Sequence, residues 1–253
     1  MQIRAIGFSR TDKVNPRYKS QTIAFANSSF YSYFCRKFIL MHFISEELEL
    51  YVERHSQDEP ELLVQLFRET HQKVLQPRML SGHFQGRVLS MLSKIIRPKH
   101  ILEIGTYTGY AALCLAEGLA PEGTLDTIDI KEELVGIQHK YFNLSPWKDQ
   151  ITAHLGNALE VIPTLDKKFD LVFIDADKEN YIAYFHLIVP MMNPGGIILS
   201  DNVLWSGKVL EELDPRDTST KVLLEYNALL KNDPRVETVL LPIRDGLTVS
   251  RVL

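Results

Sequence analysis

The feature that most constrains the fold is an alternation of short apolar runs and helical stretches that begins at His100. The runs are predicted strands, at Ile101–Ile104, Leu125–Ile130, Ile151–Leu155, Leu171–Ile174 and Gly196–Leu199. Between them we expect helices near Tyr110–Glu117, Lys131–Phe142, Ala158–Leu165 and Tyr181–Met192. Largely apolar strands that alternate with helices are typical of a parallel sheet covered on both faces. The sequence therefore predicts an α/β fold.

The segments on either side of this region carry their own signals. Before it, we expect helices from Ser45, which can act as an N-cap, to Tyr51, then at Glu61–Val74 and Gln85–Ile96. The last of these has an apolar stripe, made of Val88, Leu89, Leu92, Ile95 and Ile96. After a helix at Lys221–Leu230, the runs Val236–Pro242 and Leu247–Val252 flank a turn at Arg244-Asp245-Gly246. This end therefore predicts an antiparallel pair of strands.

Charge separates the first forty residues from the rest. Residues 1–40 carry seven basic side chains and one acidic side chain, Asp12, whereas the remainder is acidic. They also lack a hydrophobic period, so we expect a basic, poorly ordered extension in front of one domain at residues 43–253. Two alternatives stay open for this extension, namely a transit peptide and sequence upstream of a natural start at Met41.

Composition excludes several classes of function. The net charge of −4 gives no general affinity for nucleic acid. The two cysteines, Cys35 and Cys114, form no Cys-x-x-Cys pair, which argues against a zinc-thiolate site and fits a reducing compartment. No apolar run is long enough to span a membrane. We therefore expect a cytoplasmic protein.

A glycine-containing loop follows the first predicted strand, at Glu103-Ile-Gly-Thr-Tyr-Thr-Gly-Tyr110. Glycines let the backbone approach a ligand closely, and the following helix offers free N–H groups. Gly105 and Gly109 lack the spacing of a dinucleotide fingerprint. Asp129, at the end of the second strand, can accept both hydroxyls of a ribose. The alternative is a structural turn beside a solvated acid.

Oxygen-bearing side chains follow two further strands. Asp175 follows the fourth strand, and Asp201 and Asn202 follow the fifth. Neighbouring parallel strands lie roughly 4.8 Å apart and end at one edge, so these side chains should converge. Two carboxylates and an amide oxygen suit Mg²⁺. The alternative is that the acids cap the following helices.

Lys178 lies three residues after Asp175. A lysine beside a bound cation loses its proton more readily and can act as a base. The alternative is an ordinary surface lysine.

Together these motifs resemble the caffeoyl-CoA and catechol O-methyltransferases from about Phe43 to the C-terminus. The resemblance rests on motifs in order, namely the loop at residues 103–110, Asp175-Ala-Asp-Lys178, Asn180-Tyr181, Asp201-Asn-Val-Leu-Trp205 and Leu241-Pro-Ile-Arg-Asp-Gly246. The variant at residues 201–208 looks closer to bacterial members. The resemblance implies a class I methyltransferase fold, with a seven-stranded, mostly parallel sheet that has one antiparallel strand, and a homodimer.

The resemblance also implies site residues. S-adenosylmethionine would be bound by Met79, Ser81, Glu103, Gly105, Thr106, Tyr107, Ala111, Asp129, Ala158, Asp175 and Tyr184. A divalent cation, Mg²⁺, would be held by Asp175, Asp201 and Asn202, and Lys178 would be the base that deprotonates a catechol-like acceptor.

Two positions depart from the family pattern. Ala111 stands where members usually have Ser, and Asn157 stands where many bacterial members have Asp. Two other functions remain open from the residues alone, namely methylation of a nucleic acid and a non-catalytic nucleoside-binding module. The acidic domain argues against the first, and Lys178 beside a set of metal-type ligands argues against the second.

Overall fold

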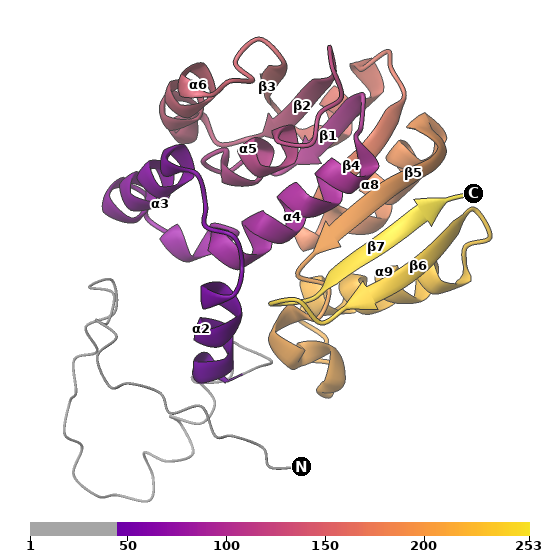
Figure 1. Ribbon diagram of the computed structural model, residues 1–253. Helices are drawn as coiled ribbons and strands as arrows, with labels where there is room; N and C mark the ends of the chain where they lie inside the picture. The colour runs from indigo at the N-terminus through magenta and orange to yellow at the C-terminus, as the bar shows by residue number, and fades with distance from the viewer. Residues whose placement is uncertain (1–44) are drawn as a thin grey trace, which may run out of the picture. The chain divides into compact units, whose positions relative to one another are not determined.

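The computed structural model describes residues 45–253, which form one seven-stranded sheet with helices on both faces (Figure 1). The strand order is β3-β2-β1-β4-β5-β7-β6. The strands are β1 (His100–Ile104), β2 (Thr124–Asp129), β3 (Ile151–Leu155), β4 (Phe169–Ile174), β5 (Met192–Asp201), β6 (Val236–Leu241) and β7 (Leu247–Val252). Only β7 runs against its neighbours, so the predicted mostly parallel sheet with one antiparallel strand is confirmed.

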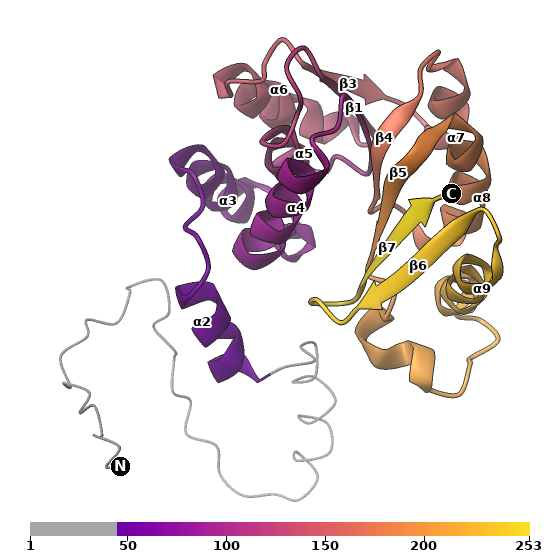
Figure 2. The ribbon, with the colours of Figure 1, turned by 45° about the vertical axis from the view of Figure 1, so that its right-hand side comes forward.

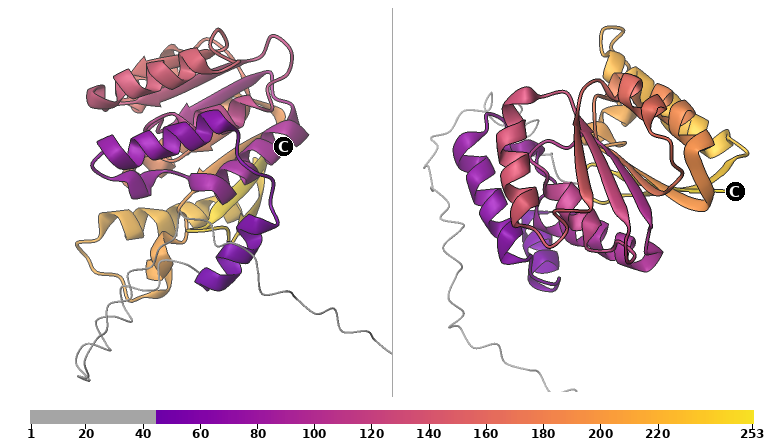
Figure 3. Two further views of the ribbon diagram at one scale, coloured as in Figure 1. Left: turned by 60° about the vertical axis from the view of Figure 1, so that its left-hand side comes forward. Right: turned by 90° about the horizontal axis from the view of Figure 1, so that it is seen from above.

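The helices form two layers around the sheet (Figures 2 and 3). The helices α3 (Glu61–Lys73), α4 (Gly82–Ile96), α5 (Tyr110–Ala116) and α6 (Val135–Leu144) cover one face. The helices α7 (Ala158–Val161), α8 (Tyr181–Ile188) and α9 (Thr218–Asn232) cover the other. The helix α2 (Glu46–Arg54) precedes them, and Ser45 caps it by accepting a hydrogen bond from the backbone N–H of Leu48. It is one turn longer than predicted.

Short 3-10 helices connect these elements. They are η1 (Pro77–Met79), η2 (Glu132–Leu134), η3 (Ile162–Thr164), η4 (Lys178–Asn180), η5 (Val189–Met191) and η6 (Trp205–Leu210). The helix η2 comes directly before α6, η3 directly after α7 and η5 directly after α8. The sequence predicted each of these pairs as one continuous helix.

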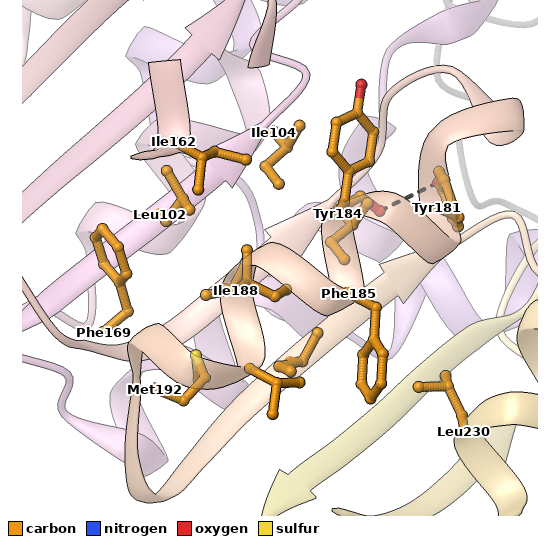
Figure 4. Packing of buried hydrophobic residues seen from close by; sticks show 14 of the residues in the cluster. Leu102, Ile104, Ile162, Phe169, Tyr181, Tyr184, Phe185, Ile188, Met192 and Leu230 are labelled. Carbon is orange, nitrogen blue, oxygen red and sulfur yellow. Dashed lines mark hydrogen bonds between the residues drawn. The ribbon is translucent and has the colours of Figure 1, made fainter. Parts of the chain in front are cut away.

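Two apolar cores explain why the central strands are apolar on both sides. One core lies between the sheet and the layer of α7, α8 and α9, where Leu102, Ile104, Phe185 and Ile188 pack together (Figure 4). The other lies under α3 to α6 and contains Ile101 of β1 together with Leu125 of β2 and Leu171 of β4. The side chains of β1 alternate between the two cores, as expected for a strand buried on both faces.

The helix α4 differs from its prediction in the face that it buries. The predicted stripe included Ile95, but this side chain is 71% exposed. The other stripe residues do face the core, because Leu89 is buried and Val88, Leu92 and Ile96 pack against it. The buried face also carries small and polar residues, namely Gly86, Ser90 and Ser93. Small residues let α4 approach α5 closely, and the hydroxyl of Ser93 donates to the backbone oxygen of Leu115 at 2.6 Å.

Within residues 45–253, no helix is long and apolar enough to cross a membrane. The predicted extension at residues 1–40, including Cys35, lies outside the described residues.

Candidate active site

The candidate site lies where the parallel strands β1, β4 and β5 end. The register pairs Ile104 with Ile174, and Ile174 with Ser200. Asp175 therefore follows the paired end of β4 directly, and Asp201 follows Ser200 at the end of β5. The carboxyl ends of parallel strands are where open α/β sheets bind their ligands.

The loop after β1 is packed tightly against the end of β4. Gly105 has a φ of +103°, and a Cβ atom there would lie 2.2 Å from the backbone oxygen of Asp175. The backbone N–H of Asp175 in turn donates to the oxygen of Ile104 at 2.9 Å. Only glycine fits this position, because any side chain would collide with the backbone that carries Asp175. The loop and the carboxylate cluster are therefore parts of one site.

Glu103 is fully buried at the end of β1. One carboxyl oxygen accepts a hydrogen bond from the hydroxyl of Thr127, which also contacts the hydroxyl of Thr106 at 2.5 Å. The other carboxyl oxygen, Oε1, has no hydrogen-bond partner among residues 45–253. Burial raises the pKa of Glu103 well above its usual value. An unpartnered buried carboxyl oxygen fits a site for a positively charged ligand, because such a ligand would satisfy it.

Asp129 is held at the end of β2 by two backbone donors. The N–H of Tyr107 donates to Oδ2 at 2.6 Å, and the N–H of Lys131 donates to Oδ1 at 2.9 Å. Tyr107 itself has a φ of +49°, which turns its N–H toward this carboxylate. Each carboxyl oxygen has a second lone pair, so the group can still accept from two vicinal hydroxyls.

Further residues predicted to line the cofactor lie at the starts of α5 and α7. Ala111 is buried in the first turn of α5, and Ala158 begins α7. Asn157 caps α7, because its side-chain oxygen accepts from the N–H of Leu159 at 3.0 Å. This bond leaves the NH₂ group of Asn157 as the donor available to a ligand.

Met79 and Ser81 precede α4, as predicted. Met79 is 45% exposed and Ser81 is buried. Arg244, from the turn between β6 and β7, donates to the backbone oxygen of Ser81 and to Oε1 of Gln85 at 2.6 Å. The turn after β6 thus fastens the start of α4, a connection for which the sequence gives no signal.

Asp175, Asp201 and Asn202 form the candidate metal set. Asp201 is 2% exposed, and burial together with the charge of Asp175 raises its pKa to about 6. Its Oδ1 accepts from the N–H of Asn202 at 2.8 Å, and Asn202 has a φ of +58°. The negative charges of Asp175 and Asp201 repel each other, and a bound cation would offset this repulsion. Among residues 45–253, no group of three or more His, Cys, Asp and Glu side chains could hold a metal.

Lys178 is buried beside this set, with 7% of its surface exposed. Its ammonium group donates to Oδ1 of Asp175 at 3.2 Å and to the hydroxyl of Tyr181 at 2.6 Å. The nitrogen also lies 4.7 Å from the ring centroid of Tyr181 and 5.9 Å from that of Trp205. Lys178 is therefore a fixed part of the site, and the interpretation as a surface lysine is wrong.

Tyr184 and Tyr181 lie on the same helix but differ in their contacts. Tyr184 was predicted at the cofactor, and its hydroxyl donates to Oδ1 of Asp177 at 2.6 Å. Tyr181 belongs to the motif Asn180-Tyr181, but the sequence assigns no role to its side chain, because a tyrosine on an apolar helix looks like an ordinary core residue. It lies within the apolar core (Figure 4). Its hydroxyl nevertheless contacts Lys178, the backbone oxygen of Ile174 at the end of β4 and the backbone oxygen of Asp201 at the end of β5.

Comparisons with known proteins agree with this geometry. The family model described as O-methyltransferase matches residues 53–253. Caffeoyl-CoA O-methyltransferase 5 from Nicotiana tabacum is 36% identical over 204 residues, which are 76% of this chain and 85% of that protein.

Two solved structures extend the comparison to three dimensions. An SAH-bound methyltransferase from Podospora anserina has a TM-score of 0.75 and 29% identity, covering 83% of this chain and 97% of the other. The O-methyltransferase TomG from Streptomyces achromogenes, in complex with SAM, has a TM-score of 0.74 and 26% identity, covering 83% and 99%. The chain therefore belongs to the O-methyltransferase family and is an S-adenosylmethionine-dependent O-methyltransferase related to the caffeoyl-CoA O-methyltransferases.

Proposed function

We propose that this enzyme transfers a methyl group to one hydroxyl of a catechol-like small molecule, with a divalent cation bound by Asp175, Asp201 and Asn202 and with Lys178 as the general base. The observation that carries the proposal is the buried Lys178 nitrogen, 3.2 Å from Oδ1 of Asp175, beside two neighbouring strand ends that bear only oxygen ligands. The names of the curated relatives, which are caffeoyl-CoA O-methyltransferases, support an acceptor with vicinal hydroxyls.

The donor set supports Mg²⁺ as the cation. It contains two carboxylates and one amide and has no sulfur or imidazole, which is the chemistry that a hard cation prefers. When bound, the cation would supply positive charge that favours ionisation of an acceptor hydroxyl. The carboxyl groups of Asp175 and Asp201 would hold it, and the left-handed backbone at Asn202 would support the third ligand.

The cofactor residues support the donor side of the reaction. S-adenosylmethionine would supply an electrophilic methyl group. Glu103 and the loop around Gly105 would bind its amino-acid end, Asp129 would accept its ribose hydroxyls, and the start of α7 would line the adenine. These residues orient the donor, while Lys178 accepts the proton of the acceptor hydroxyl. Rate would come mainly from holding the two reactants in a reactive orientation.

One assay tests the proposal. Methyl transfer from S-adenosylmethionine to caffeoyl-CoA, caffeic acid and catechol is measured with Mg²⁺ and with excess chelator, and phenol serves as the control acceptor. We expect turnover of at least one vicinal diphenol, loss of turnover with chelator, recovery with Mg²⁺ and poor reaction of phenol. Full activity in chelator, or no turnover of any of the three diphenols, contradicts the proposal.

Three further parts of the proposal rest on the resemblance and on composition. We propose a homodimer, a cytoplasmic location, and a domain at residues 43–253 that follows a basic extension at residues 1–40. The acidic net charge of −4 supports a small molecule rather than a nucleic acid as the acceptor.

A further inference from the structure

We propose that Tyr181 is a positioning residue for Lys178, and that its hydroxyl holds the lysine nitrogen so that the lone pair of the amine faces the acceptor. This inference rests on the proposed role of Lys178 as the base and adds a residue to which no role in catalysis has been given.

The contacts of the Tyr181 hydroxyl fix the direction of its hydrogen bonds. Its oxygen lies 2.9 Å from the backbone oxygen of Asp201 and 3.2 Å from that of Ile174. Both carbonyls can only accept, so the phenol hydrogen must point to one of them. The phenol oxygen is then left as an acceptor, and the nitrogen of Lys178 donates to it at 2.6 Å.

The second partner of the lysine nitrogen is also an acceptor, namely Oδ1 of Asp175 at 3.2 Å. An amine that acts as a base has two N–H bonds and one lone pair. The hydroxyl of Tyr181 and the carboxylate of Asp175 occupy those two N–H directions. The lone pair must therefore point away from both partners, which is the orientation that a base needs toward an acceptor hydroxyl.

The surroundings make this arrangement rigid. Tyr181 is fully buried, and its ring packs edge-on against Tyr226 with centroids 5.3 Å apart. Because the same hydroxyl also bonds to the backbone of Asp201, it ties the base to the loop that carries the candidate metal ligands. A shift of about 1 Å at a reacting group can cost roughly 100-fold in rate, so this tie matters for turnover.

The chain offers a matched control. Tyr226 is also fully buried in the same cluster, and its hydroxyl contacts the hydroxyl of Ser200 at 2.7 Å but has no bond to Lys178. Tyr181→Phe and Tyr226→Phe remove the same chemical group from the same core. The hydroxyl of Tyr181 has more partners than that of Tyr226, so the melting temperatures of both variants show how much of any fall in kcat follows from lost stability.

The test compares Tyr181→Phe, Tyr226→Phe, Lys178→Ala and the double variant Tyr181→Phe/Lys178→Ala. The acceptor is whichever of caffeoyl-CoA, caffeic acid and catechol the wild-type enzyme turns over fastest, with Mg²⁺ present. We measure kcat, KM for both substrates, the melting temperature, and the affinity for S-adenosylhomocysteine by calorimetry. We expect Tyr181→Phe to lower kcat about 10- to 100-fold with unchanged cofactor affinity, and Tyr226→Phe to keep kcat. In the Lys178→Ala background, Tyr181→Phe should have no further effect on kcat.

The outcomes separate this inference from the proposed function. If Lys178→Ala is slow but Tyr181→Phe has the same kcat as Tyr226→Phe, the positioning role of Tyr181 is contradicted. The proposed role of Lys178 as the base is then unaffected. The same holds if Tyr181→Phe lowers kcat equally with and without Lys178, because its effect would then not pass through the lysine. If Lys178→Ala turns over at the wild-type rate, or if the wild-type enzyme methylates none of the three acceptors, the proposed function itself fails.

Discussion

Asp201 and Asp129 both end strands at the same edge of the sheet, but they differ in surroundings. Asp201 is buried beside Asp175, whereas Asp129 is half-buried and accepts two backbone N–H groups. We therefore expect Asp201→Ala to abolish turnover and to leave affinity for S-adenosylhomocysteine nearly unchanged. Asp129→Ala should weaken that affinity about 10- to 100-fold, because a hydrogen bond to a charged group contributes about 1.5–3 kcal/mol.

Calorimetric titration of both variants measures this difference, and the melting temperature of each serves as the control for folding. Equal loss of cofactor affinity in the two variants would show that the two carboxylates do not have separate ligands.

Lys178→Ala should retain the cofactor and turn over slowly, because a positioned general base contributes about 10²- to 10⁴-fold to the rate. Raising the pH should partly restore kcat, since the acceptor hydroxyl then ionises into water without help from a base. The measurement is kcat against pH for the wild-type enzyme and the variant. A constant ratio of the two rates at every pH would mean that the lysine does not remove the proton.

At the scale of single residues, sequence predicted those positions that a motif identifies. Asp175, Asp201 and Lys178 stand out because polar groups directly after apolar strands need an explanation. Tyr181 and Arg244 lie within motifs of the family resemblance, but the sequence assigns no role to either side chain, because a tyrosine on an apolar helix and an arginine in a turn are ordinary residues by themselves. Arg244 and Gln85 lie 159 residues apart along the chain, and the hydroxyl of Tyr181 bonds to the backbone of Asp201 on β5, so only the fold brings these groups together.

At the scale of elements, the helix α4 depends on close packing against α5 in addition to its apolar stripe. Its buried face carries Gly86, where a Cβ atom would lie 2.7 Å from Cε1 of Tyr110 and 2.9 Å from Sγ of Cys114. Both neighbouring side chains are buried, so they cannot move away into solvent. Gly86→Ala should therefore destabilise the protein by about 1–3 kcal/mol, because overpacking forces a backbone or side-chain shift.

Gly136→Ala on α6 is the matched control, since nothing lies within 4 Å of its Cβ position. Alanine should be neutral or stabilising there by up to about 1 kcal/mol, because it is the better helix former. Thermal unfolding measures both variants, and each kcal/mol shifts the melting temperature of a domain this size by roughly 2–4 °C. Equal melting temperatures for the two variants would contradict the close contact of α4 with α5.

A surface cluster connects α3 to α6. Glu69 accepts from Lys140, from Lys73 at 2.8 Å and from the hydroxyl of Tyr141 at 2.8 Å, and these bonds lower its pKa to about 2. A carboxyl group whose pKa is lower in the folded state stabilises the fold above its ordinary pKa, and this contribution disappears as the pH falls toward 2. Glu69→Gln should therefore cost about 1 kcal/mol at pH 7, the upper end for exposed ion pairs.

The free energy of unfolding of Glu69→Gln and wild type is compared from pH 7 down to the lowest pH at which both fold. The difference should shrink below about pH 4.5. Glu61→Gln on the same helix, where Glu61 accepts only a 3.3 Å bond from Gln65 among the described contacts, is the control. A difference that does not depend on pH would remove the electrostatic explanation.

For the whole molecule, the seven-stranded, mostly parallel sheet with one antiparallel strand was predicted from the apolar runs, the terminal turn and the family resemblance, whereas the order of the strands was not. The extents of the elements were less accurate. The strand β5 runs from Met192 to Asp201, whereas the sequence predicted only Gly196–Leu199, because Asn193 and Pro194 disfavour a strand locally. Met192 pairs with Phe169 of β4, and the register shifts before Ile197 pairs with Leu171, so the residues that were missed form an irregular start of the strand.

The last prediction concerns the part of the chain that the sequence sets apart by charge. Residues 1–40 carry seven basic side chains against one acid, and the family model begins only at residue 53. Ser45 also caps α2, so the first described helix has its own start signal in the chain after Met41. A protein that starts at Met41 should therefore keep its melting temperature and its methyl-transfer rate.

Both are measured against the full chain under the same conditions. A fall of several degrees would mean that the extension contributes more than about 1 kcal/mol to the folded state, because one kcal/mol corresponds to roughly 2–4 °C here. A normal melting temperature with a reduced rate would instead give the extension a role in acceptor binding.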